Sequence, residues 1–317
     1  MHTDWTALAA PAQLLGESPF WHPQEQRLYW VDITGRALLR ARLDGSTPEC
    51  WPMPAEPGCI APARCQGRPV GLVVALRGRI CHAPQWGGTL VELAQLPIDP
   101  ARQRANDGKC DALGRLWVGT LHEPLSGPRQ PVGALYCVDL RRPGTALVQP
   151  MLEQVATANG LAWSPDGRRL YFADTPSHCI RAWDCNARGE PQGTPQVLQR
   201  FAPRDPPERA GGPRPYGGRP DGACVDAEGA YWCALYEGAR LLRLSPSGQC
   251  LQELALPLAC PTMPCLGGPD GRTLLVTSAS AGRSAQELAA RPLSGRVLQR
   301  RVAVPGLPVA WCELGRR

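Results

Sequence analysis

The sequence lacks the residue spacings that mark zinc clusters and disulfide frameworks. It contains 14 cysteines, but no two of them form a C-x-x-C pair, and none of its five histidines forms H-x-H or H-x-x-x-H. Metal clusters and disulfide scaffolds usually show such patterns. No secretory leader pattern precedes the cysteines. We therefore expect free, mostly buried thiols in a protein of the reducing cytoplasm, because cysteine packs as a small hydrophobe.

Clustered positive charge and long apolar runs are also missing. Lys109 is the single lysine, so the net charge of +6 comes almost wholly from arginines, which form no run of five or more. A nucleic-acid groove needs a clustered basic face, and a membrane-spanning helix needs about 20 apolar residues. The sequence therefore predicts neither a nucleic-acid partner nor a membrane span. The dispersed arginines fit a solvated surface, although a diffuse positive charge can also attract anionic sugar acids.

Catalytic motifs of covalent hydrolases and nucleotide-dependent enzymes are absent too. The chain has no G-x-S-x-G nucleophile elbow and no G-x-G-x-x-G run, and the glycines before Lys109 have the wrong spacing for a phosphate loop. The sequence therefore favours neither serine–histidine chemistry nor a nucleotide cofactor.

Glycine and proline are abundant, with 34 and 35 residues respectively. They alternate with short apolar runs, which is typical of many short strands joined by turns. Four segments repeat one form, in which a short apolar strand, a polar turn with glycine and a second strand follow one another. These segments are NDGKCDALGRLWVGT from Asn106, NGLAWSPDGRRLYFADT from Asn159, DGACVDAEGAYWCALYEG from Asp221 and MPCLGGPDGRTLLVTSA from Met263.

The turns give these repeats a common register. We count back eight residues from the turn glycine of each of these four segments and from Gly67. In the first unit, Glu25 takes the place of the glycine. The count marks one residue in each unit. The six positions are 17, 59, 106, 159, 221 and 263, which lie 42 to 62 residues apart. Units of this length match the four-stranded blades of a propeller. We therefore predict an all-β fold, a single six-bladed β-propeller domain over residues 1–317, with the six positions at one end of its channel.

Two further segments have expected places in this ring. Residues 5–15 precede the first inner strand, so we expect them to complete the last blade and close the ring, which leaves no long unpaired edge. Residues 202–220 are rich in proline, glycine and arginine, and they are expected to form a loop that leads into the fifth unit and caps the channel mouth.

Four of the six convergent positions carry oxygen: Glu17, Asn106, Asn159 and Asp221. Taken singly, each is a common turn residue, but their shared register favours a site. Two carboxylates in one narrow channel would raise each other's pKa unless a cation separates them. Carboxylate and amide oxygens suit hard cations such as Ca²⁺, Mg²⁺ or Mn²⁺. The sequence therefore predicts a central divalent metal site, and Cys59 is expected to pack in the core.

Four linked motifs then resemble one family. GESPFWHP from Gly16, RANDGKCDALGRLWVGT from Arg104, ANGLAWSPDGRRLYFADT from Ala158 and RPDGACVDAEGAYWCALYEG from Arg219 are similar to the gluconolactonase family that includes regucalcin, the senescence marker protein. The likeness extends from about residue 14 to residue 280, in the family's order. The stretch PTM…GGPD from Pro261 is closer to bacterial sugar lactonases.

The resemblance implies a function and a set of site residues. It implies hydrolysis of a sugar lactone by a six-bladed propeller with one divalent ion, calcium first and zinc, manganese, magnesium or iron as alternatives. The family's metal ligands fall on Glu17, Asn159 and Asp221, and its substrate contacts on Arg104 and Asn106. We assign Asp221 the further role of general base.

One departure from the family concerns the substrate. Where regucalcin has two acidic residues after its G-T motif, this chain has Glu123 followed by Pro124. The second acid, a substrate contact, is therefore missing, and Glu123 or His122 is expected to replace it. Asp174 is expected either to support the site or to hold a turn.

Two other functions remain open at this point. One is hydrolysis of an aryl ester or an organophosphate at the same metal, because fold alone does not choose the substrate. The other is a non-enzymatic calcium-binding propeller. The sequence leaves the sugar, the native metal and the oligomeric state undetermined.

Overall fold

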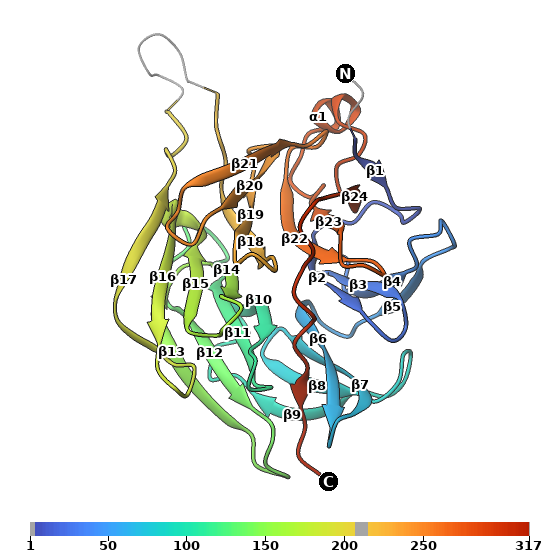
Figure 1. The fold of residues 1–317 in the computed structure, drawn as a ribbon, viewed down its shortest axis with the longest axis vertical. Coiled ribbons are helices and arrows are strands. Elements are labelled where there is room, and N and C mark those ends of the chain that lie inside the picture. Colours follow the sequence, from blue (N-terminus) through green and yellow to red (C-terminus); the bar gives the residue numbers. More distant parts are fainter. Residues whose placement is uncertain (1–3, 207–214, 317) are drawn as a thin grey trace.

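The computed structural model describes residues 4–206 and 215–316 of the 317-residue chain. The strands of the described residues form six separate sheets, each built on a four-stranded antiparallel unit. The sheets are arranged around a common centre, with one inner strand from each sheet facing it (Figure 1). The fold is therefore a six-bladed β-propeller, as the repeat of turns predicts. None of the helices in these residues is long and apolar enough to cross a membrane.

The strands follow the chain from the inner to the outer edge of each blade. Blade 1 holds β2 (Gly16–His22), β3 (Arg27–Asp32), β4 (Ala37–Ala41) and β5 (Glu49–Pro52). Blade 2 holds β6 (Pro57–Cys65), β7 (Arg68–Leu76), β8 (Arg79–Ala83) and β9 (Val91–Gln95). Blade 3 holds β10 (Gln103–Cys110), β11 (Leu116–His122), β12 (Gly133–Asp139) and β13 (Leu147–Val155).

The second half of the chain builds the remaining blades in the same way. Blade 4 holds β14 (Ala158–Trp163), β15 (Arg169–Asp174), β16 (Cys179–Cys185) and β17 (Pro191–Arg200). Blade 5 holds β18 (Arg219–Val225), β19 (Tyr231–Tyr236), β20 (Arg240–Leu244) and β21 (Cys250–Ala255). Blade 6 holds β22 (Pro261–Gly267), β23 (Thr273–Ser278), β24 (Leu298–Arg301) and β1 (Thr6–Ala7). Two short helices, η1 (Thr175–Ser177) and α1 (Ala285–Ala290), lie between strands.

The ring is closed by the first strand of the chain. Strand β1 pairs antiparallel with β24, with Thr6 opposite Gln299. Beside it, the indole of Trp5 donates a hydrogen bond to the carbonyl of Ala255 at 2.9 Å. This confirms that the segment before the first inner strand completes the last blade. The expected loop over residues 202–220 carries no strand in its described part before Arg219, and its capping role involves residues 207–214, which lie outside the described residues.

The C-terminal strap, residues 302–316, is a feature that the repeat pattern does not predict. It runs across the centre of the ring (Figure 1) and ends in β25 (Cys312–Glu313), which pairs parallel with β6. Backbone hydrogen bonds tie it to other blades on the way. These are Gly306 N to Gly271 O at 2.9 Å, Ala227 N to Pro305 O at 2.9 Å, and Glu313 N to Gly114 O at 2.9 Å. The strap therefore fastens blades 2, 3, 5 and 6 at the end of the channel where the hairpin turns lie.

The hairpin turn in blade 5 shows how these repeats fold. The fully buried carboxylate of Asp226 accepts hydrogen bonds from the backbone N–H groups of Glu228 and Ala230, both at 3.0 Å. It also accepts from the indole of Trp232 at 2.9 Å and the guanidinium of Arg243 at 2.8 Å. The turn, the second strand and the third strand therefore share one acceptor. Asp111 in blade 3 makes the equivalent contacts with its own turn and Trp117.

This shared acceptor generates a stability prediction. Asp226→Ala should lower the free energy of unfolding by about 3–5 kcal/mol, because it leaves a guanidinium and several buried donors without their partner. Urea unfolding followed by tryptophan fluorescence measures the change. Asp270→Ala is the matched control, since Asp270 pairs with Arg301 on the surface at a hairpin turn of blade 6 and such pairs contribute little. Equal losses in both variants would contradict the assigned role of Asp226.

Candidate functional site

The candidate site is built on β-bulges in the inner strands. In β2, β10, β14, β18 and β22, two consecutive residues lie unpaired opposite a single residue of the next strand. A bulge of this kind bends a strand and changes the direction of its side chains. Glu17 and Asn159 immediately precede the unpaired residues of their strands, whereas Asn106 and Asp221 belong to them. The bulges therefore lie at the positions that the turn count marks.

Backbone conformation accounts for two of these bulges. Ser18, which follows Glu17, has φ of 49°, and Gly160, which follows Asn159, has φ of 65°. This left-handed region is readily accessible to glycine. A Cβ at Gly160 would also lie 2.6 Å from the hydroxyl oxygen of Tyr231. The dipeptide Asn159-Gly160 therefore marks a bulge beside the site.

A chain of hydrogen bonds joins polar side chains of blades 3 and 4 and ends on a backbone carbonyl of blade 5. Arg104 Nη1 donates to Asn106 Oδ1 at 2.9 Å, and Asn106 Nδ2 donates to Asn159 Oδ1 at 3.0 Å. Asn159 Nδ2 in turn donates to Thr175 Oγ1 at 2.8 Å, and this hydroxyl donates to the carbonyl of Pro220 at 2.8 Å. The Asn159 amide is therefore held with its oxygen on the side of Asn106 and its NH₂ group on Thr175.

The two buried carboxylates of Glu17 and Asp221 interact electrostatically. Their residues are 5% and 7% exposed, respectively. Burial raises the pKa of Glu17 well above its usual value, and the charges of Asp221 and Asp107 raise this pKa further. Burial, together with the charge of Asp107, raises the pKa of Asp221 to about 8. Like charges thus converge in a low-dielectric space, where their repulsion is strong.

Asp107 is a buried acid that the sequence analysis did not select. Its Oδ2 accepts from the backbone N–H of Leu161 at 2.9 Å, whereas its buried Oδ1 has no hydrogen-bond partner among the described residues. Burial raises its pKa, which the charge of Lys109 partly offsets. Strict alternation would send Asp107 to the side opposite Asn106. Because both are unpaired residues of the β10 bulge, the rule of alternation does not apply to them.

Glu123 lies next to the expected substrate contacts. Its Oε1 accepts from Arg104 Nε at 3.2 Å, and its Oε2 accepts from Arg77 Nη1 at 3.0 Å. The other expected replacement for the missing acid, His122, instead accepts from the backbone N–H of Gln130 at 2.8 Å. His122 therefore holds the loop that follows β11, and Glu123 is the acid beside Arg104.

Two other side chains singled out by the sequence have packing or turn contacts. Asp174 accepts from the backbone N–H of Thr157 at 2.8 Å and of Ala156 at 3.3 Å. It thereby fixes the chain that leads into β14, which is the turn role among the two expected for it. The fully buried Cys59 belongs to the apolar cluster between blades 2 and 3, as expected.

The chemistry of the donor set fits a divalent cation. No group of three or more His, Cys, Asp or Glu side chains is placed to hold a metal in the described ranges. The expected set instead consists of two carboxylates and one amide oxygen, from Glu17, Asp221 and Asn159. Such oxygen donors are the ligands that hard divalent cations prefer. A cation between the acids would also relieve their mutual repulsion.

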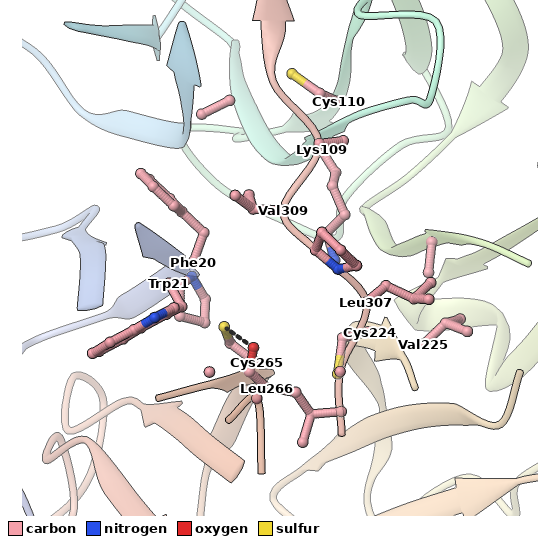
Figure 2. A pocket seen from close by; sticks show the side chains of 18 of the residues that line it. Phe20, Trp21, Lys109, Cys110, Cys224, Val225, Cys265, Leu266, Leu307 and Val309 are labelled. Atoms are coloured by element: carbon pink, nitrogen blue, oxygen red, sulfur yellow. Dashed lines mark hydrogen bonds between the residues drawn. The ribbon is translucent and has the colours of Figure 1, made fainter. Parts of the chain in front are cut away.

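A large cavity of about 690 Å³ lies at the other end of the channel. Its lining includes Phe20 and Trp21 from β2, Leu266 from β22, and Leu307 and Val309 from the C-terminal strap (Figure 2). None of the three expected metal ligands belongs to this lining. The expected ligands thus lie outside this lining, although Ser18, the neighbour of Glu17, belongs to it.

Comparisons with known proteins agree with this architecture. The sequence model described as SMP-30/Gluconolactonase/LRE-like region matches residues 15–280. The chain is 42% identical to 6-deoxy-6-sulfogluconolactonase of Pseudomonas putida, over 92% of this chain and 93% of that protein. It is 33% identical to L-arabinolactonase of Azospirillum brasilense, over 96% and 94%. It is 32% identical to regucalcin of Gallus gallus, over 93% of each.

Solved structures show the same fold. A calcium-binding protein, regucalcin, from Agrobacterium tumefaciens superposes with a TM-score of 0.83 at 25% identity, covering 97% of each chain. Luciferin-regenerating enzyme superposes with a TM-score of 0.82 at 25% identity, covering 98% of this chain and 99% of that one. The family model, these relatives and the six blades together show that the chain belongs to the SMP-30/gluconolactonase family.

Proposed function

We propose that this protein hydrolyses a sugar lactone to the corresponding sugar acid, with one divalent cation held by Glu17, Asn159 and Asp221. The observation that carries the proposal is the meeting of two buried carboxylates and an oriented amide at one end of the channel. The Arg104–Asn106 pair lies directly beside them. Two relatives that match more than nine-tenths of the chain are named as lactonases, which supports this reaction over others.

Calcium is the first candidate for the cation, because a structural neighbour is named as a calcium-binding protein. Zinc, manganese, magnesium and iron are the alternatives. When bound, the ion would supply a Lewis acid for the lactone carbonyl and lower the pKa of a nearby water.

The side chains of the site have separate roles in this reaction. Asp221 accepts a proton from the attacking water, as a carboxylate within hydrogen-bond reach can do. The water oxygen bonds to the carbonyl carbon, the ring C–O bond breaks, and the ring oxygen takes up a proton to give the open hydroxy acid. Arg104 and Asn106 orient the lactone, which lowers the entropic part of the barrier. Glu123, held by Arg104, offers an acceptor for a sugar hydroxyl.

Removal of the metal is the direct test of this function. Treatment with chelator should abolish hydrolysis of a panel containing gluconolactone, its 6-deoxy-6-sulfo analogue and arabinolactone, and one of Ca²⁺, Mn²⁺, Mg²⁺, Zn²⁺ or Fe²⁺ should restore it. Proton release in a pH-stat assay measures the rate. Turnover of aryl esters or organophosphates alone would indicate the other hydrolase class. Tight Ca²⁺ binding with no turnover of any ester would indicate a non-enzymatic calcium-binding propeller.

Substitution of the carboxylates separates their roles. Asp221→Ala should lower kcat by at least about 10²–10⁴-fold, the usual contribution of a general base, and Glu17→Gln should weaken binding of the cation. Calorimetric titration with the ion that restores activity measures the second effect. Glu228→Gln is the control, since Glu228 is an exposed acid in the turn of blade 5, and its rate and affinity should match the wild type. Full activity of Asp221→Ala would refute its assignment.

Thr175 generates a test of the amide orientation. Thr175→Val keeps the shape of the side chain but removes the hydroxyl that holds Asn159 Nδ2. It should weaken cation binding by about 10–100-fold, as loss of a group that orients a ligand usually does. Thr175→Ser keeps the hydroxyl and should restore most of the affinity. If both variants bind the cation as the wild type does, Asn159 is not a ligand oriented in this way.

A further inference from the structure

Among the described residues, several arginine side chains gather near the candidate site. Glu237 directly follows β19. The last residue of β19, Tyr236, pairs with Arg219, which lies two residues before Asp221 in the sequence. This one carboxylate faces three guanidinium groups, from Arg204 at 3.3 Å, Arg219 at 3.5 Å and Arg283 at 3.1 Å. Arg283 also pairs with Glu287 at 3.6 Å, so in the described part of the chain these three guanidinium groups share two carboxylates.

Arg129 adds a further positive charge from blade 3. It is an exposed residue of the loop between β11 and β12, but its Nη1 donates to the hydroxyl of the buried Thr157 at 2.8 Å. Among the described residues, no carboxylate lies within ion-pair distance of it. Thr157 is two residues before Asn159, so this hydrogen bond brings the guanidinium of Arg129 to the start of β14, beside the candidate site.

Arg129 and Arg219 act on the same space. Desolvation of its guanidinium group lowers the pKa of Arg129, although the residue as a whole is exposed. The charge of Glu123 raises this pKa, the like charge of Arg219 lowers it, and the charge of Asp221 raises it. Arg219 stands two residues before Asp221 in β18, and its guanidinium carbon lies 5.2 Å from the centre of the Tyr236 ring. The aromatic face supports the guanidinium from one side. Two cations from different blades therefore act electrostatically on Asp221, and their mutual repulsion would fall if an anion bound near both.

We propose that Arg129 and Arg219 form an anion-binding subsite beside the lactone site, and that the substrate carries a strongly acidic group at the end remote from its carbonyl. This inference rests on the proposed lactonase function. A guanidinium group presents a planar fork of donors that matches the oxygens of a sulfonate, phosphate or carboxylate. The buried carboxylates at the axis would repel such a group. A lactone bearing this anion would therefore bind in a single orientation, with its charged end at the arginines.

The test compares a neutral lactone with the same lactone carrying a 6-sulfonate or a 6-phosphate. The wild type should show a higher kcat/KM for the anionic lactones, mainly through a lower KM. In Arg129→Gln and Arg219→Gln, the ratio of kcat/KM between anionic and neutral lactone should fall about 10–100-fold, as loss of one charge-assisted hydrogen bond predicts. Arg219→Lys keeps the positive charge but loses the planar fork of donors. Its ratio should therefore lie between that of the wild type and that of Arg219→Gln.

A matched control removes the same charge elsewhere. Arg240→Gln takes one positive charge from blade 5, where Arg240 pairs with Glu253 and the carbonyl of Gly217, and its ratio should equal that of the wild type. An equal fall in Arg240→Gln would mean that only net charge matters. No preference of the wild type for anionic lactones, or unchanged ratios in Arg129→Gln and Arg219→Gln, would overturn the subsite.

Failure of the proposed function gives a different result. If neither neutral nor anionic lactones are hydrolysed, calorimetry with the metal-loaded protein can still compare a 6-sulfonated sugar acid with its neutral counterpart. Tighter binding of the sulfonated acid, lost in Arg129→Gln and Arg219→Gln, would support the subsite without the reaction. Equal binding of the two acids would overturn it.

Discussion

Closure of the ring by β1 is the constraint on which the rest of the structure depends. Thr6 pairs with Gln299, and this contact turns a row of similar hairpins into a ring with a common axis. Glu17, Asn159 and Asp221 come from blades 1, 4 and 5, so they can act together only when every blade is in its place. The site is therefore a property of the closed ring, and no single blade contains it.

The repeat of turns predicts much of this arrangement from the sequence. Each unit rebuilds the same hairpin, so a fixed count from its turn glycine reaches the same point of each inner strand. That count marked Glu17, Asn106, Asn159 and Asp221 among its six positions, and the bulges of the structure lie at these points. The sequence also predicted that the N-terminal segment would complete the last blade, because it precedes the first inner strand and closure of the ring leaves no long unpaired edge.

Other parts could not be predicted for physical reasons. Asp107 was not predicted as a site residue, because the alternation of side chains along a strand assigns it to the side opposite Asn106. A bulge removes this constraint, since it leaves two consecutive residues outside the strand pairing. The position of Arg129 depends on an irregular loop whose conformation is set by His122 and Thr157, and no periodicity encodes such a loop. The C-terminal strap follows the last outer strand with no repeat signal, so its path across the ring depends on contacts that exist only after folding.

The C-terminal strap also forms part of one end of the channel. It crosses the end that carries the hairpin turns, and its residues Leu307 and Val309 line the cavity there. The opposite end carries the buried acids and, around them, the arginines. A small molecule that enters the cavity from the strap end must therefore pass beside the strap. In the proposed reaction, ring opening creates a new carboxylate near Glu17 and Asp221, and repulsion by these acids would help release the product.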